Sequence, residues 1–110
     1  MAITIQIHYS GTNGNAQKFA REMMHSGIVD KIRKEEGNLG YTYYLPMENE
    51  ETVLLIDSWT DQQALDRHHA SPMMQQIIAL REQYDLHMRV ERCRTDEAGV
   101  PQKDQAYIRK

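Results

Sequence analysis

Two adjacent histidines, His68 and His69, are the side chains of this sequence best suited to chemistry near neutral pH. They end the segment "DQQALDRHH", whose pattern predicts a short helix. Neighbouring residues on a helix point about 100° apart, so this pair cannot coordinate one metal ion as histidines at positions i and i+4 do. The spacing therefore predicts no metal site here.

His68 shares a helical face with Ala64 and Leu65, which predicts that its ring points toward the sheet. Two interpretations remain open from the residues alone. His68 is either a core histidine hydrogen-bonded to a backbone carbonyl, or a base lining a cavity between the helices and the sheet. His69 lies one step around the helix, on its flank, and we expect it to contact a ligand there.

The strand before this helix ends with Asp57 and Trp59 on the same face as its buried apolar residues. Asp57 either caps a neighbouring turn or belongs to a pocket that raises its pKa. We expect Trp59 and a tyrosine of the preceding strand, Tyr43, to form the pocket wall. Met73, on the following helix, is either plain core or part of a soft wall for a planar ligand.

The elements that must position these side chains follow from periodicity. Residues 2–9 and 86–94 alternate apolar and polar, and residues 39–46 and 51–59 are rich in aromatic and β-branched residues, all typical of strands. Residues 16–32 and 73–84 carry apolar stripes typical of helices. In the first helix, Ser26-Gly27 predicts a bend. Thr60 and Ser71-Pro72 predict the starts of two later helices.

This order, β-α-β-β-α-α-β, predicts a ferredoxin-like α+β fold with one antiparallel sheet and its helices on one face. Residues 1–94 form the predicted domain, and residues 95–110 a polar tail that could form a strand against a partner subunit. The run "VLLI" at residues 53–56 is apolar on both faces, so Leu54 and Ile56 need a cover on the helix-free face. A second copy of the chain is the simplest cover, which predicts a homodimer.

Composition excludes several classes of function. The 110 residues fit one domain, and no apolar run is long enough to cross a membrane. The net charge of -3, with basic and acidic residues alternating, offers no basic stripe for nucleic acid. The N-terminus has no basic leader region, which predicts a cytoplasmic protein, and the single Cys93 excludes an internal disulfide. Nucleotide-binding, nucleophile-elbow and zinc-protease motifs are missing.

Three stretches, "EEGNLGYTYY", "VLLIDSW" and "DQQALDRHHASPMM", resemble the antibiotic biosynthesis monooxygenase family in order and spacing over roughly residues 2–93. The most specific part is the W-x8-H-x2-S-P arrangement of Trp59, His68, Ser71 and Pro72. The resemblance implies a dimeric α+β barrel of ferredoxin-like subunits. Members include cofactor-free oxygenases of polyketide aromatics, quinol oxygenases, haem-degrading enzymes and an isomerase of a phosphorylated signal, so the family alone fixes no reaction.

Departures from the family narrow these possibilities. Leu55 and Leu65 stand where the polyketide-oxidising branch has an asparagine and a tyrosine, and Ile78 stands where the haem-degrading branch has its iron-ligating histidine. Met73 replaces the histidine of the common S-P-H sequence. These changes disfavour polyketide oxidation, haem and a mechanism with two histidines.

The leading prediction is a monooxygenase without cofactor that acts on a small quinol, phenol or polyketide-like substrate, with His68 as the catalytic base. Trp59, Tyr43, Asp57, His69 and Met73 are the predicted substrate-binding residues. Two alternatives remain: an isomerase of a small oxygenated signal that uses the same base without oxygen, and a dimeric metabolite-binding module without catalysis.

Overall fold

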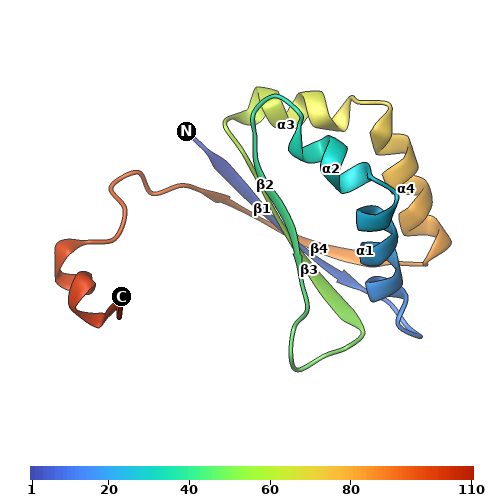
Figure 1. Cartoon of the computed structure of the whole chain (residues 1–110), viewed down its shortest axis with the longest axis horizontal. Helices are drawn as coiled ribbons and strands as arrows, with labels where there is room; N and C mark the ends of the chain where they lie inside the picture. The colour runs from blue at the N-terminus through green and yellow to red at the C-terminus, as the bar shows by residue number, and fades with distance from the viewer.

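The computed structural model describes residues 1–110 and has one four-stranded antiparallel sheet in the order β2-β3-β1-β4. Figure 1 shows the four α-helices together on one face of this sheet, which confirms the predicted ferredoxin-like α+β fold. The elements are β1 (Ile3–Ser10), α1 (Asn15–His25), α2 (Ile28–Arg33), β2 (Asn38–Tyr44), β3 (Thr52–Trp59), α3 (Gln62–His69), α4 (Met73–Gln83), β4 (His87–Arg94) and a 3-10 helix (Gln102–Tyr107).

The core lies between the sheet and the helices, and the two central strands supply its floor. β1 buries every second residue, and β3 does the same. Trp59 is fully buried at the end of β3, and Phe19 and Met23 bring the face of α1 against the sheet. The buried residues of β1 are Ile3, Ile5, Ile7 and Tyr9, and those of β3 are Val53, Leu55, Asp57 and Trp59.

The predicted first helix is broken in two at Gly27, as the Ser26-Gly27 pair suggested. Gly27 has φ +89°, a left-handed conformation that glycine adopts at little cost, and α2 starts again at Ile28. The chain therefore turns at this point while Ile28, Val29 and Ile32 still bury their side chains. Gly37 lies beyond the end of α2 and has φ +83°. It leads directly into β2.

Two of the predicted helix starts are corrected by the structure. Asp61, not Thr60, caps α3, because its side chain accepts a hydrogen bond from the Ala64 amide at 2.9 Å. The Ser71 hydroxyl donates to the His68 carbonyl at 2.8 Å, so it secures the end of α3 instead of capping α4. These bonds fix the helix that carries both histidines at its two ends.

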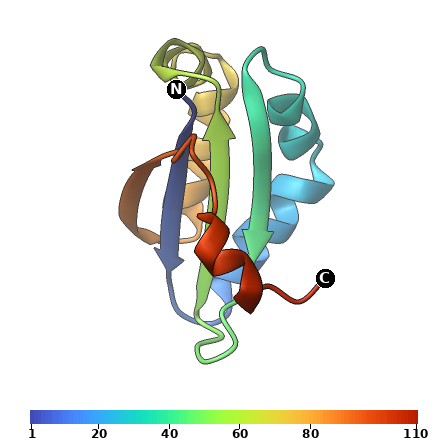
Figure 2. The ribbon, with the colours of Figure 1, turned by 90° about the vertical axis from the view of Figure 1, so that its left-hand side faces the viewer.

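The opposite face of the sheet carries no helix. Leu54 and Ile56 are half-buried there, and Tyr44 is exposed. Figure 2 shows the C-terminal segment crossing in front of this face, and Figure 1 shows it leaving β4 away from the helices. In the single chain this segment forms the 3-10 helix and no strand, and Tyr107 is 88% exposed. None of the helices combines the length and apolar character needed to span a membrane.

Candidate active site

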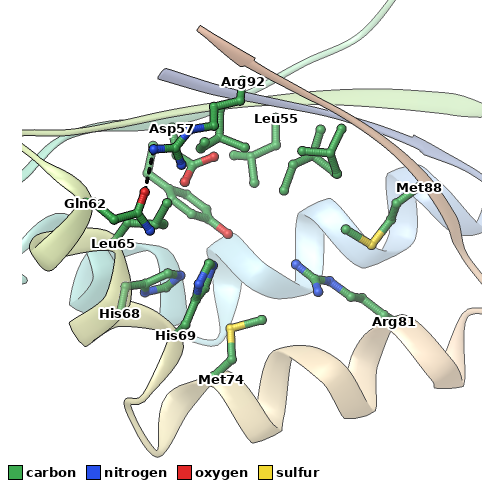
Figure 3. Close-up of a pocket in the computed structure, with 14 residues that line it drawn as sticks. Leu55, Asp57, Gln62, Leu65, His68, His69, Met74, Arg81, Met88 and Arg92 are labelled. Carbon is green, nitrogen blue, oxygen red and sulfur yellow. Dashed lines mark hydrogen bonds between the residues drawn. The ribbon is translucent and has the colours of Figure 1, made fainter. Parts of the chain in front are cut away.

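A cavity of about 320 Å³ lies between the sheet and the α3-α4 pair, at the end of the domain where α3 begins. Its floor is apolar, made by Ile5, Ile7 and Leu55 of the two central strands. Its polar side chains come from β2, β3, β4, α3 and α4, and Figure 3 shows several of them converging on one space. They are Tyr41, Asp57, Gln62, His68, His69, Arg81 and Arg92.

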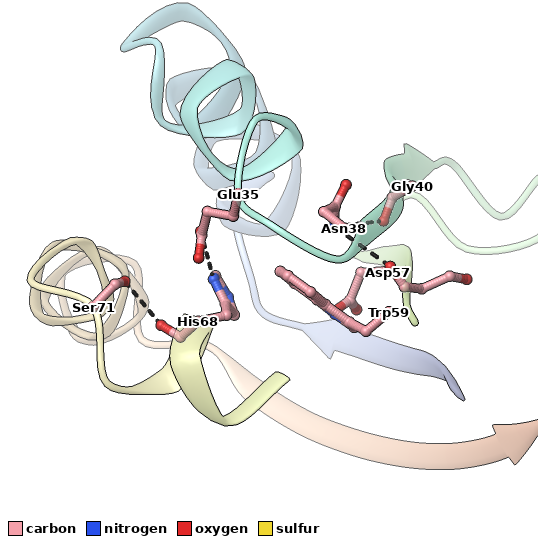
Figure 4. Close-up of polar contacts among 8 residues, drawn as sticks. Glu35, Asn38, Gly40, Asp57, Trp59, His68 and Ser71 are labelled. Atoms are coloured by element: carbon pink, nitrogen blue, oxygen red, sulfur yellow. Dashed lines mark hydrogen bonds and ion pairs between the residues drawn. The ribbon is translucent and has the colours of Figure 1, made fainter. Parts of the chain in front are cut away.

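His68 is 4% exposed and reaches the cavity from the inner face of α3. Its Nδ1 lies 2.9 Å from the Glu35 Oε1, a carboxylate from the turn before β2 (Figure 4). With Nδ1–H donating to Glu35, Nε2 keeps the lone pair of the neutral ring. Nε2 has no hydrogen-bond partner in the chain and is not sealed from solvent. The carboxylate thus holds the ring of His68 in one orientation and leaves Nε2 without a partner in the chain.

Trp59 supports His68 from behind. Its indole stacks on the imidazole with ring centroids 4.8 Å apart and an angle of 28°. The Trp59 Nε1 donates to the Asp57 Oδ2 at 2.8 Å. One buried indole therefore holds the ring of His68 and the carboxyl of Asp57 in fixed positions.

Asp57 lies in the cavity wall with its Oδ1 buried and without a hydrogen-bond partner. Burial raises the pKa of its carboxyl, against a smaller opposing effect of the Trp59 hydrogen bond. A carboxyl in such a place holds its proton more tightly than one in water.

Arg81 enters the cavity from α4, opposite the two histidines (Figure 3). Its Nε donates to the Tyr9 hydroxyl at 3.1 Å, and no carboxylate lies within salt-bridge distance of its guanidinium. Burial lowers the pKa of His69, and so do the positive charges of a protonated His68 and of Arg81, against an opposing effect of Asp66. His69 therefore stays neutral at neutral pH, and Arg81 is the permanent charge in this part of the cavity.

Comparison with known proteins places this arrangement in a family. The family model described as "Antibiotic biosynthesis monooxygenase" matches residues 2–80. The chain belongs to the antibiotic biosynthesis monooxygenase family. The match covers β1 to most of α4 and so includes Glu35, Asp57, Trp59 and His68. No curated protein gives a significant match.

Solved structures share the fold of this monooxygenase family member at low sequence identity. A candidate antibiotic biosynthesis monooxygenase from Deinococcus radiodurans is 20% identical, with a TM-score of 0.75 over 88% of this chain and 94% of its own. A conserved protein from Methanosarcina mazei is 24% identical, with a TM-score of 0.74 over 87% and 94%. SnoaB, a cofactor-independent oxygenase from Streptomyces nogalater, is 12% identical, with a TM-score of 0.72 over 87% and 94%.

The structure brings three of the predicted site residues to the cavity of this family member and leaves three outside it. His68, Asp57 and His69 line the cavity. Trp59 lies behind His68 rather than in the wall, since the stacked imidazole separates it from the open space.

Tyr43 and Met73 are replaced in the wall by their neighbours Tyr41 and Met74. Tyr41 pairs with Asp57 across the sheet, whereas Tyr43 lies two residues further along β2, edge-on to Phe19 with ring centroids 6.3 Å apart. Met74 is the residue of α4 that faces the two histidines in Figure 3.

Four polar residues of the site could not be recognised as site residues from the sequence. Glu35 belongs to the charged run "RKEE", and Gln62, Arg81 and Arg92 look like ordinary surface residues of helices and a strand. Arg92 of β4 donates to the Gln62 side chain of α3, and this contact closes one edge of the cavity (Figure 3). No group of three or more histidine, cysteine, aspartate or glutamate side chains is arranged to hold a metal ion.

Proposed function

We propose that this family member is a cofactor-independent monooxygenase of a small phenol or quinol, with His68 as the general base. The observation that carries the proposal is the Nε2 of His68, unpartnered and open to a cavity with an apolar floor, while Glu35 holds Nδ1. A base must reach the substrate proton directly, and an unpartnered nitrogen on a ring that lines the cavity supports this role. The cofactor-independent oxygenase SnoaB shares the fold, which adds support.

Oxidation without a cofactor requires little from the protein besides a base and a cavity. Dioxygen reacts slowly with closed-shell organic molecules, so the substrate itself must become an electron donor, as a phenolate or enolate. His68 would take the hydroxyl proton, and the resulting anion passes electrons to dioxygen and bonds to it at carbon. The protonated His68 then returns the proton to the peroxide oxygen, which gives a hydroperoxide and restores the base. Loss of water from that hydroperoxide leaves a quinone. One oxygen atom ends in the product and the other in water, with four electrons drawn from the substrate.

Surrounding groups favour the anion that this step creates. Arg81 places an unpaired positive charge in a partly buried site, where charges interact more strongly than in water. Tyr9 keeps its proton, because burial raises the pKa of its phenol, and so it remains a neutral partner of Arg81. Asp57 and His69 are proposed to bind the substrate from the wall of the same cavity.

We also propose that the working form is a homodimer joined through the helix-free face of the sheet. Leu54 and Ile56 lie at the centre of that face on β3, flanked by Tyr44 on β2. The tail of residues 95–110 projects on the same side and exposes Val100, Tyr107 and Ile108, which do not belong to the hydrophobic core. A second copy would cover both surfaces at once.

Oxygen uptake with hydroquinone tests the proposed activity. The wild-type protein should consume one dioxygen per quinol, and His68→Gln should lose this activity by at least about 100-fold with an unchanged melting curve. His25→Gln, an exposed histidine at the end of α1, is the matched control and should keep full activity. Turnover of the substrate under nitrogen would instead support an isomerase, and full activity of His68→Gln would remove His68 from the mechanism.

A further inference from the structure

The guanidinium of Arg81 can favour a developing phenolate by its charge, but base-assisted oxidation of a neutral quinol does not require two free terminal nitrogens in the cavity. Arg81 uses only Nε within the chain, on the Tyr9 hydroxyl, and its carbon Cζ lies 5.6 Å from the Tyr9 ring centroid. Its two terminal nitrogens make no hydrogen bond and no salt bridge. Arg81 is half-buried and fixed at Nε, so its two terminal nitrogens are free to bind a ligand in the cavity.

The charges around the cavity are unbalanced in favour of positive groups. Arg81 and Arg92 line it, and neither has a carboxylate partner, since Arg92 bonds the amide oxygen of Gln62. Asp57 is the single carboxylate among the lining residues, and its Oδ2 already accepts from Trp59. Glu35 stands behind His68 and does not line the cavity. An anionic ligand would correct this imbalance, whereas a neutral one would leave Arg81 unpaired.

The N–H groups of the two terminal nitrogens of an arginine match the two oxygens of a carboxylate in spacing and plane. The cavity, at about 320 Å³, suits a compound of one or two rings. Because Arg81 and His68 point into the cavity from opposite sides, one planar molecule can meet both at its two ends (Figure 3).

We propose that the ligand of this site is an aromatic acid: a hydroxylated ring whose carboxylate binds the terminal nitrogens of Arg81 while its hydroxyl faces His68 Nε2. This inference rests on the proposed function for the role of the hydroxyl. The binding of the acid end, however, is measurable without any reaction.

Two roles of Arg81 are separable by experiment. If it binds a substrate carboxylate, its loss weakens charged ligands selectively and shows mainly in KM. If it only stabilises the developing phenolate, its loss lowers kcat equally for charged and uncharged quinols.

The test is calorimetric titration under nitrogen, at about pH 7, with 2,5-dihydroxybenzoate and with 2,5-dihydroxybenzamide as its uncharged analogue. The wild-type protein should bind the acid at least about tenfold more tightly than the amide, since hydrogen bonds to a charged group are the stronger ones. Arg81→Met should abolish that preference, and Arg81→Lys should retain part of it. Arg67→Met, at an exposed arginine of α3 outside the cavity, should bind like the wild type.

Equal affinity of the wild type for acid and amide would overturn the inference without any variant having to fold. Persistence of the preference in Arg81→Met would overturn it as well. If the preference is absent but oxygen uptake depends on His68, this inference fails alone. If the preference is present and no oxygen is consumed, the oxygenase proposal fails while the aromatic-acid site stands.

Discussion

The Nδ1 of His68 and the Oε1 of Glu35 lie 2.9 Å apart, although 33 residues separate them in the chain. Glu35 stands in the turn between α2 and β2, and His68 near the end of α3. In the neutral ring this contact favours the tautomer with its proton on Nδ1, which leaves the lone pair on Nε2. Without the carboxylate, His68 would distribute its proton between both nitrogens and would be a base for only part of the time.

Replacing Glu35 with glutamine should therefore change the tautomer of His68. A glutamine amide can donate as well as accept, so the fraction of the Nε2–H form should rise, with at least about a tenfold fall in kcat. Nitrogen-15 NMR of the imidazole measures the tautomer directly, apart from activity. Glu36→Gln, at the exposed neighbour, is the control and should leave both readings as in the wild type. An unchanged NMR spectrum in Glu35→Gln would show that the carboxylate does not orient the ring.

Asp57 should make folding stability depend on pH in a distinctive direction. Burial raises the pKa of its carboxyl in the folded state above the unfolded value of 3.8. As pH rises from that value through the raised folded pKa, the unfolded chain releases the proton first, so Asp57 lowers stability across this window. Asp57→Asn keeps an acceptor for Trp59 and has no proton to lose. Its stability relative to the wild type should rise over the same window.

Urea denaturation of wild type and Asp57→Asn at several pH values measures that difference. Above the window the stability of the variant relative to the wild type should level off at its highest value, because the neutral amide avoids the desolvation cost of the buried carboxylate charge. Asp104→Asn, at an exposed site of the tail, should show no such trend. A constant difference between Asp57→Asn and wild type at all pH values would contradict the argument.

Gly37 should tolerate no side chain. It has φ +83°, and a Cβ there would lie 2.5 Å from the Ala64 Cβ and 2.8 Å from the Thr60 Oγ1. Gly37→Ala should therefore lower the free energy of unfolding by about 1–3 kcal/mol beyond the backbone strain alone. Gly14→Ala supplies the control, because Gly14 has φ +73° with no atom near the added Cβ. Equal losses of unfolding free energy in Gly37→Ala and Gly14→Ala would show that α3 shifts to accommodate the added methyl group at no energetic cost.

The helix-free face should be a subunit interface. Wild-type protein should run as a dimer in light scattering, and Ile56→Glu should run as a monomer with an unchanged circular dichroism spectrum, because a charge would be buried at the centre of the interface. Gln76→Glu, at an exposed position of α4 on the other side of the molecule, adds the same charge and should remain a dimer. A monomeric wild type at all concentrations would refute the proposed assembly.

The tail should act in association and not in folding. Residues 95–110 are hydrogen-bonded to their own domain by one backbone bond, from the Thr95 amide to the Ala2 carbonyl, and their other hydrogen bonds lie within the tail. A chain that ends at Arg94 should therefore keep the domain fold, while its dimer should dissociate at a higher concentration than the full chain's. An unchanged dimer dissociation constant would show that the tail makes no contact with the partner.

The sequence by itself determined the elements and their faces. Alternation in residues 2–9 and the apolar stripe of the first helix leave few ways to bury their side chains, and a fold of this size must bury them. The shared face of Ala64, Leu65 and His68 likewise follows from helix geometry, which is enough to place His68 on the buried side of α3. The strand-end tryptophan and the S-P sequence were singled out because they match the motif of the family.

Only the tertiary structure decided which side chains meet. Strand register puts Tyr41, not Tyr43, opposite Asp57, and the rotation of α4 about its axis turns Met74, not Met73, to the cavity. Glu35 and Arg81 reach the site from segments that are charged and unremarkable in sequence. Periodicity fixes the direction of a side chain about its own element, whereas the meeting of two elements depends on packing of the whole core. Local pattern therefore located the buried histidine, whereas global packing brought the carboxylate and the guanidinium near it.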